Sequence, residues 1–139
     1  MNRTFLLFLV LISLYAQSQE KIHCEGLKSL AIKISVILDS KPQHKVIRKS
    51  DLLKNDLKIL LNDSACQLIG FIAGYDCHSG GRSLVFDYNE KTFFGNTIKA
   101  KDPFIKEIWV GDMLSFECIN VRKKGKLFLL PGISFNVID

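Results

Sequence analysis

The sequence predicts an all-β sandwich with one or two short helical turns, and three observations support this. Apolar and polar residues alternate in several short runs, which is the pattern of half-buried strands. Glycine and proline residues punctuate these runs at short intervals, as turns require. From residue 40 onward no internal repeat, low-complexity tract or linker interrupts the pattern. The chain therefore reads as one compact domain of packed sheets.

Residues 1–18 are typical of a secretory signal peptide. Arg3 gives a short positive start, residues 5–15 form an apolar run too short to span a bilayer comfortably, and small residues precede the expected cleavage site. Gln19 is then the first mature residue, and residues 19–139 form the single expected domain. An uncleaved membrane anchor is the alternative. We expect an exported protein, periplasmic or secreted, with no integral membrane segment after cleavage.

The expected mature region contains four cysteines, and an even count in an exported chain favours disulfides over free thiols. They are Cys24, Cys66, Cys77 and Cys118. Three pairings are open, and the sequence does not select one. No two cysteines have the close spacing of zinc-ribbon ligands. Metal binding through His23 and His78 beside their neighbouring cysteines is the weaker alternative, because adjacent strand residues point to opposite faces. We expect no metal and no cofactor.

The charge of the chain is mildly basic. The formal net charge is +5 for the 139 residues, and removal of Arg3 with the signal peptide lowers it by one. The basic residues gather at 41–49 and 122–126, without aromatic residues between them. Because base stacking needs such aromatic residues, we expect no nucleic acid as partner. Solvated turns are the simpler interpretation of both groups.

The first expected strand covers residues 30–38, where apolar residues occupy every second position. A turn at residues 39–43 ends it. Ser50 is expected to cap a short helix with Asp51 in its first turn, at the positive end of the helix dipole. The apolar cluster at residues 57–61 is equally consistent with a helix and with an irregular packed segment.

Three further strands are expected in the middle of the chain, at residues 66–75, 82–87 and 91–95. Gly70 and Gly74 indicate a bulge in the first of these strands, or the close approach of a neighbouring backbone. Turns at residues 78–81 and 89–90 separate the three strands.

A single helical turn is expected to begin at Asp102 and Pro103, as an N-cap residue and a first-turn proline. It continues to Ile108. Trp109, directly after it, is expected to seal the core. Gly111 then begins a turn that leads into the last third of the sandwich.

The most strongly patterned strand follows that turn. Leu114 and Phe116 share one face, but Ile119 and Val121 are out of phase with them by one residue. One extra residue near Cys118, a β-bulge, would direct both pairs to the core.

A hairpin is expected at residues 122–125, with Gly125 available for positive φ. Residues 127–137 return as the partner strand. Pro131 and Gly132 interrupt this return, because a proline cannot donate to a strand ladder.

Several of these motifs together resemble a known family. The pattern is Gly111-Asp112-x-Leu114-x-Phe116-x-x-Ile119-x-Val121, followed by Gly125 and by Leu130-Pro131-x-Ile133-x-Phe135-x-Val137. Upstream lie Val46-Ile47-Arg48-Lys49-Ser50-Asp51-Leu52 and Leu68-Ile69-Gly70-Phe71. In order and spacing, these segments resemble the C-terminal immunoglobulin-like domain of GldM, the periplasmic shaft protein of gliding motility and type IX secretion. The resemblance covers residues 45–137.

The resemblance implies an immunoglobulin-like sandwich that acts as a non-enzymatic protein-interaction or structural module of the bacterial periplasm or envelope. It also implies an envelope protein as partner, among gliding or type IX secretion components. Members of the family carry a membrane helix and several periplasmic domains before this one, whereas only a cleavable signal and a short segment are expected here. Lys124 stands where the family has an acidic residue, and the four cysteines lie outside the pattern.

Two other functions stay open on the sequence. A thiol-dependent hydrolase would use Cys77 with His23, His44 or His78, which needs nucleophile and base within hydrogen-bond reach. A small-ligand-binding sandwich is the other, although most aromatic residues fall in phase with the expected core. We expect no enzyme. A homodimer formed by exchange of the strand at 30–38 is compatible with the sequence.

Overall fold

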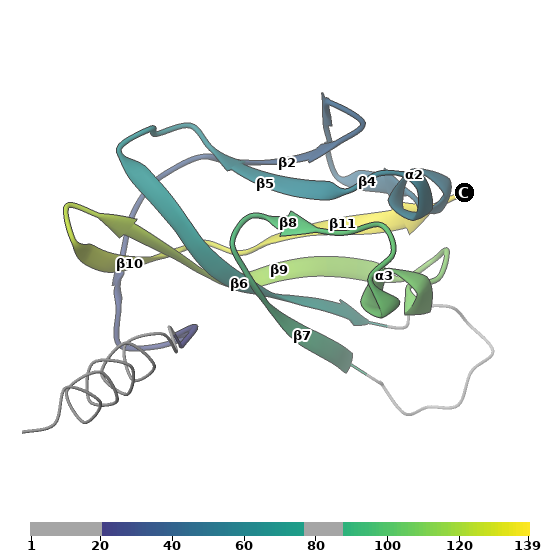
Figure 1. Ribbon diagram of the computed structural model, residues 1–139. Helices are drawn as coiled ribbons and strands as arrows, with labels where there is room; N and C mark the ends of the chain where they lie inside the picture. The colour runs from purple at the N-terminus through teal and green to yellow at the C-terminus, as the bar shows by residue number, and fades with distance from the viewer. Residues whose placement is uncertain (1–20, 77–87) are drawn as a thin grey trace, which may run out of the picture.

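The computed structural model describes residues 21–76 and 88–139. The expected signal peptide, the turn at 78–81 and the strand at 82–87 lie outside the described residues. Within the described ranges the chain forms two β-sheets and two short helices. Figure 1 shows the sheets as two layers, with β2 and β5 in one and β9 and β11 in the other. The prediction of an all-β protein is confirmed, with the two sheets stacked as a sandwich.

The larger sheet is built around one long strand, β9. Its seven strands are β1 (Lys28–Ser29), β4 (Val46–Arg48), β6 (Cys66–Asp76), β7 (Tyr88–Phe94), β9 (Met113–Lys123), β10 (Lys126–Leu130) and β11 (Ile133–Ile138). On one side β6 pairs with β9 along its length, and β7 pairs with β6. On the other side β11 and β10 pair with the first and second halves of β9. β4 and β1 extend these two in parallel.

The smaller sheet has the strand order β3-β2-β5-β8 and is antiparallel throughout. Its strands are β2 (Ile34–Leu38), β3 (Lys41–Pro42), β5 (Leu57–Leu61) and β8 (Thr97–Ile98). The first predicted strand, 30–38, is therefore confirmed in its second half only. Leu30 and Ile32 still pack against the core, partly buried, but neither belongs to a strand. The predicted turn follows, with Asp39 and Ser40 both at positive φ.

The cluster at residues 57–61 is strand β5, so both alternatives considered for it, a helix and an irregular segment, were wrong. Leu57 and Ile59 are buried, whereas Lys58 and Leu60 are exposed. Buried and exposed residues alternate as in a half-buried strand. The sequence does not show this alternation, because the exposed position 60 is a leucine. Pairing with β2 on one side and β8 on the other makes the segment a strand.

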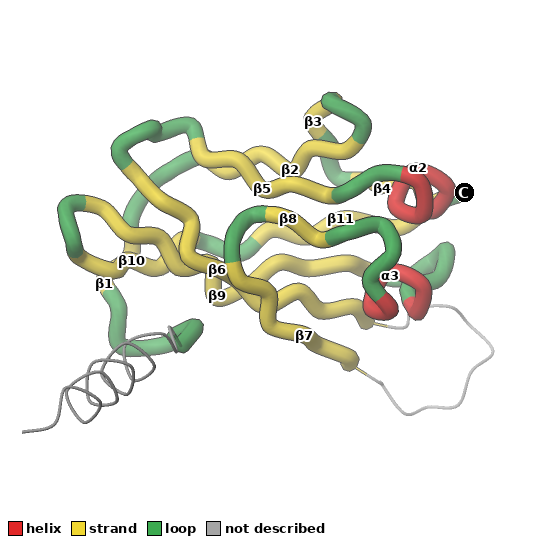
Figure 2. Tube along the Cα trace, in the orientation of Figure 1, coloured by secondary structure: helices red, strands yellow, loops and turns green. Residues whose placement is uncertain are grey.

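Two short helices, α2 (Lys49–Lys54) and α3 (Pro103–Glu107), lie at the same end of the sandwich (Figure 2). A hydrogen bond connects the two helices, since Nζ of Lys49 in α2 donates to the carbonyl oxygen of Ile105 in α3 at 2.7 Å. Ser50 was predicted to be the N-cap of α2, but it lies inside the helix. Arg48 is at the N-cap position and makes no side-chain cap hydrogen bond there. The reason is that the helix starts directly after β4, where Arg48 still pairs with Ile138.

The predicted start of α3 is confirmed. An oxygen of the Asp102 side chain accepts a hydrogen bond from the Phe104 backbone N–H at 3.0 Å, with Pro103 following the cap. Lys91 reaches across from β7, and its Nζ lies 2.9 Å from both carboxylate oxygens of Asp102. Partial burial raises the pKa of Asp102, but the hydrogen bonds from Lys91 and Phe104 and the Lys91 charge outweigh this, so the pKa lies below its ordinary value.

We expect Asp102→Ala to lower the free energy of unfolding by about 1–2 kcal/mol, because it removes the cap. Asp102→Asn keeps a cap oxygen and should cost less. Because the folded-state pKa of Asp102 is depressed, its charge stabilises the fold above the unfolded pKa of about 3.9 and this contribution is lost as pH falls through the folded-state value. Urea unfolding of the three proteins at neutral and at acidic pH measures both effects. A gap between wild type and Asp102→Asn that is unchanged in acid would contradict the charge contribution.

Two expectations near these helices were wrong. Trp109 does not seal the core, since 54% of it is exposed; the preceding Ile108 is fully buried. Helix α3 ends at Glu107, and Ile108 is already extended, so the two residues point in opposite directions. The predicted turn at 89–90 lies inside β7. Every residue of β7 except Phe93 is exposed, so its burial shows no alternation.

The predicted bulge in β9 is confirmed. Leu114, Phe116, Ile119 and Val121 all have 0% exposure. The register with β6 shifts between Gly70, opposite Asn120, and Ile72, opposite Glu117. Cys118 adopts a φ of +48° at this point. The extra residue therefore turns both apolar pairs into the core.

At Gly70 of β6 both predicted features are present, the close approach of a neighbouring backbone and a register shift with β9, whereas Gly74 is approached by a side chain. A Cβ on Gly70 would overlap the carbonyl oxygen of Phe93 in β7, and one on Gly74 would overlap the ring of Tyr88. The hairpin between β9 and β10 also forms as expected, with Lys124 and Gly125 both at positive φ.

One hydrophobic core lies between the two sheets and is closed at one end by the helices. Phe71, Phe116 and Phe135 are its largest fully buried side chains. Leu52 of α2 and Ile105 of α3 belong to the same cluster as Val36 and Ile59 of the smaller sheet. The sandwich is thus a single packed unit over the described residues.

Candidate interaction surface

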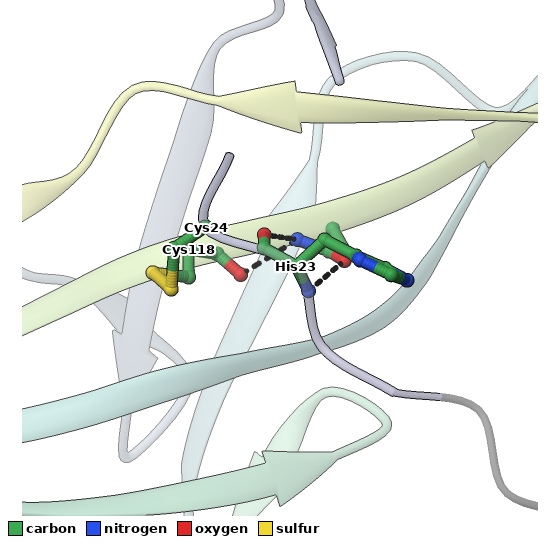
Figure 3. Close-up of a disulfide and its surroundings, with 4 residues drawn as sticks. His23, Cys24 and Cys118 are labelled. Atoms are coloured by element: carbon green, nitrogen blue, oxygen red, sulfur yellow. Dashed lines mark hydrogen bonds between the residues drawn. A yellow bond between two sulfur atoms is a disulfide. The ribbon is translucent and has the colours of Figure 1, made fainter. Parts of the chain in front are cut away.

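The structure shows one disulfide among the described cysteines. Cys24 and Cys118 form a disulfide, with their Cα atoms 4.6 Å apart (Figure 3). Cys118 is the bulged residue of β9. The bulge that directs both apolar pairs of β9 into the core therefore also places the Cys118 sulfur where it bonds to Cys24. Cys66 is a free thiol in the structure. Cys77 and His78 lie outside the described residues.

Asn120 fixes the same N-terminal segment by a second means. Its side-chain oxygen accepts from the His23 backbone N–H at 2.8 Å, and its nitrogen donates to the His23 carbonyl oxygen at 2.7 Å (Figure 3). The nitrogen also donates to the carbonyl oxygen of Cys118 at 2.9 Å. Asn120 is fully buried, so these bonds satisfy a polar group that would otherwise be costly. His23 is thereby held through its backbone beside the disulfide.

The free thiol of Cys66 has the properties of a structural cysteine. Partial burial raises its pKa, and the hydrogen bond to Asp63 and the charge of that carboxylate raise it further. The Sγ of Cys66 lies 3.5 Å from Asp63 Oδ2. Because the thiolate is the nucleophile, a raised pKa weakens nucleophilic chemistry at this residue.

We expect a thiol reagent to modify Cys66 without prior reduction, and to modify Cys24 and Cys118 only after reduction. Cys66 begins β6 and Asp76 ends it, and eleven residues of strand span roughly 33 Å. A disulfide joins Cα atoms within about 7 Å, so we do not expect Cys66 to pair with Cys77, the next residue after Asp76. Peptide mass spectrometry after alkylation measures this. A Cys66–Cys77 crosslinked peptide from a single chain would contradict it.

A groove of about 530 Å³ lies between the two sheets, away from this region. Residues 33–36 of the β2 side line one wall, and residues 133–135 of β11 line the other. Residues 42–45, which connect β3 to β4, close one end. Ile34, Val36 and Phe135 give it an apolar floor. We call this the β2–β11 groove.

The two walls of the β2–β11 groove are unpaired strand edges. β3 pairs with β2 only at Ile37 and Leu38, after which Gln43 N–H donates to the carbonyl oxygen of Val36 at 2.8 Å. The chain then leaves the smaller sheet, and β4 joins β11 only from Asn136 onward. Among the described residues no strand therefore lies beside Ile34 on the side away from β5, nor beside residues 133–135 on the side of β4.

A tight turn produces this crossing between the sheets. The Val46 N–H donates to the carbonyl oxygen of His44 at 2.6 Å, with Lys45 between them at a φ of +59°. The carbonyl oxygen of Lys45 then accepts from the Asn136 N–H at 2.8 Å, which begins the pairing of β4 with β11. A three-residue turn of this kind is strained for a non-glycine residue. It persists here because strands of both sheets hold its two ends.

The ionisable side chains that line the β2–β11 groove are all basic or histidine. They are Lys33, His44 and Lys45, and no Asp or Glu is among the lining residues. A second, more open hollow of about 780 Å³ differs, because Asp39 and Asp56 line it together with Lys54 and Lys58. Its charges compensate one another, and Asp56 is already bound by Lys99 at 2.8 Å. The β2–β11 groove is the surface that favours an anionic partner.

The sequence did not point to this groove. In the sequence Lys45 is one of a basic group at 41–49, and Lys33 is a polar position in an alternating run. Both line the groove because the chain crosses from the smaller sheet to the larger one at residues 44–46. No local sequence pattern indicates where such a crossing occurs. The sequence does not indicate the role of Asn120 either, because a polar residue between Ile119 and Val121 is the ordinary alternation of a half-buried strand.

In comparisons with family models, curated proteins and solved structures, the chain matches none. Within residues 21–76 and 88–139, no three His, Cys, Asp or Glu side chains gather as a metal site would require. No helix in the described part of the chain is long and apolar enough to cross a membrane.

Proposed function

We propose that this chain is an exported, non-enzymatic protein-interaction module of the bacterial periplasm or envelope, built as an immunoglobulin-like sandwich. One observation carries the proposal: the β2–β11 groove lies between two unpaired strand edges, one from each sheet. Unpaired edges bind extended segments of other proteins through backbone hydrogen bonds. The groove thus offers a means of binding a protein without any catalytic group.

Two further observations support the compartment. Residues 1–18 have the sequence of an export signal. The Cys24–Cys118 disulfide is of a kind that persists in oxidising compartments and is rare in the cytosol. The resemblance of residues 45–137 to the C-terminal domain of GldM supports the finer proposal, an immunoglobulin-like domain that associates with gliding or type IX secretion components.

The experiment that tests the proposed function is an affinity purification of the tagged chain from crosslinked envelopes of its host. Wild type is compared with Lys45→Glu, in the groove, and with Lys126→Glu, an equal charge change on the exposed start of β10. We expect envelope proteins that the wild type and Lys126→Glu retain and that Lys45→Glu loses. Recovery of no protein above background with the wild type would contradict the proposal.

A further inference from the structure

We propose that the β2–β11 groove binds a short extended segment of a partner protein in which apolar residues alternate with Asp or Glu. The segment pairs antiparallel to β2 and continues the line of β3. This inference rests on the proposed function, because it names the chemistry of the partner at the same surface. It follows from the direction of the free backbone groups, the face of each side chain and the charges at the groove.

On the β2 wall of the groove, the free backbone groups belong to Ile34. Lys33, one residue earlier, bonds on the β5 side: its N–H donates to Asn62 Oδ1 at 3.1 Å and its carbonyl oxygen accepts from the Asn62 N–H at 3.1 Å. Backbone groups of successive strand residues point to opposite sides. The N–H and carbonyl of Ile34 therefore point into the groove, as the carbonyl of Val36 does where it accepts from Gln43.

The register of β3 shows where an added residue would lie. Ile37 is opposite Pro42 and Leu38 is opposite Lys41. If β3 continued in this antiparallel register, Lys45 would lie opposite Ile34. Instead the turn at residues 44–46 takes the chain across to β4, and the position opposite Ile34 has no strand residue. A partner residue can fill this place and exchange both backbone hydrogen bonds with Ile34. The β2 edge is preferred over the β11 edge, because Lys45 already holds Asn136 there.

The faces of β2 determine the side chains that fit. Directly opposite residues of an antiparallel pair point to the same face. Ile34 and Val36 face the core side, so the partner residue opposite Ile34 is apolar. Lys33 and Ser35 face the other side, and Lys33 is exposed. A carboxylate opposite Lys33 would form a cross-strand ion pair, with His44 and Lys45 close by at the groove.

The test uses a capped pentapeptide, Val-Glu-Val-Glu-Val, titrated into the oxidised full-length chain and followed by NMR chemical shifts. We expect shifts at residues 33–36 and 43–45, and binding that weakens as salt screens the charges. The peptide with lysine in place of glutamate should not bind. Methylating the valine amides, which face β2, should abolish binding, whereas methylating the glutamate amides, which face away, should leave it intact.

Variants of the chain locate the site. Lys33→Glu and Lys45→Glu should each weaken binding, on the order of fivefold or more, because attraction becomes repulsion. Lys126→Glu carries the same charge change outside the groove and should bind as the wild type does. The inference is overturned if the acidic peptide does not bind up to about 1 mM, if the lysine peptide binds equally, or if the two methylated peptides behave alike.

The peptide result is independent of the envelope purification. Peptide binding without any recovered envelope protein would retain this inference and remove the proposed function. Recovered partners that depend on Lys45, without peptide binding, would retain the function and remove the strand-addition chemistry. If the groove pairs with a second copy of the chain instead, size-exclusion chromatography would show a dimer that Lys33→Glu dissociates, and that result also overturns the inference.

Discussion

Replacing both Cys24 and Cys118 by serine is expected to lower the free energy of unfolding by about 4–5 kcal/mol. The disulfide joins residues separated by 94 positions, and closing a loop of that length removes much of the entropy of the unfolded chain. A domain of this size has a total stability of roughly 5–15 kcal/mol, so the double variant loses a large share of it. Denaturant unfolding with oxidised wild type as reference measures the loss.

Cys66→Ser is the matched control for this experiment. It makes the same chemical change at a free, half-buried thiol that makes a weak hydrogen-bonding contact with Asp63. We expect it to cost less than about 1 kcal/mol. Reductant should lower the stability of the wild type toward that of the double variant and leave the double variant unchanged. A double variant as stable as Cys66→Ser would show that the loop entropy does not stabilise this fold.

The disulfide and Asn120 hold the N-terminal segment in different ways, and the double variant separates them. Asn120 binds the backbone of His23 through both ends of its amide. These bonds do not need the sulfur atoms, so in the folded double variant residue 23 should keep its place on β9. The cost of removing the disulfide is therefore expected mainly in the unfolded state, and the native amide NMR spectrum around Asn120 should change little.

Phe116→Ala is expected to lower the free energy of unfolding by about 3–5 kcal/mol. Phe116 lies on β9 with 0% exposure. Its ring meets Phe71 of β6 edge-on, at a centroid distance of 5.8 Å, and Phe135 of β11 at 6.1 Å. Truncation leaves a cavity among three strands of the larger sheet, and dense neighbouring side chains cannot fill it. Urea unfolding monitored by circular dichroism measures the change.

Phe94→Ala removes the same atoms from a position that is 59% exposed, and it serves as the control. We expect a change within about 0.5 kcal/mol. Phe116→Leu keeps most of the buried volume and should fall between the two, which guards against a Phe116→Ala protein that does not fold. Equal losses for Phe94→Ala and Phe116→Ala would contradict the position of the core.

Elements with local signals could be predicted from the sequence with nearly correct bounds. The cap and first-turn proline predicted α3, and Gly125 predicted the hairpin after β9. The phase change between Phe116 and Ile119 predicted the bulge. In each case the deciding interactions lie within a few residues along the chain. The pattern alone was therefore sufficient.

Predictions failed where a neighbour distant in sequence decided the outcome. β5 is a strand because β2 and β8 flank it, although Leu60 obscures its alternation. Ser50 is not the cap of α2 because the pairing of Arg48 with Ile138 places the helix start two residues earlier. Residues 89–90 are strand and not a turn, because β7 pairs with β6 along its whole length.

By itself the sequence determined the all-β class, the hairpin turn after β9, the bulge and the phase of the core, because these depend on the order of side chains along one strand or hairpin. Only the tertiary structure decided that Cys24 pairs with Cys118, that Asn120 holds His23, and that two strand edges remain open beside Lys33 and Lys45. Each of these joins residues far apart in the chain. Their meeting depends on how the two sheets stack and where the chain crosses between them, which no local pattern of residues encodes.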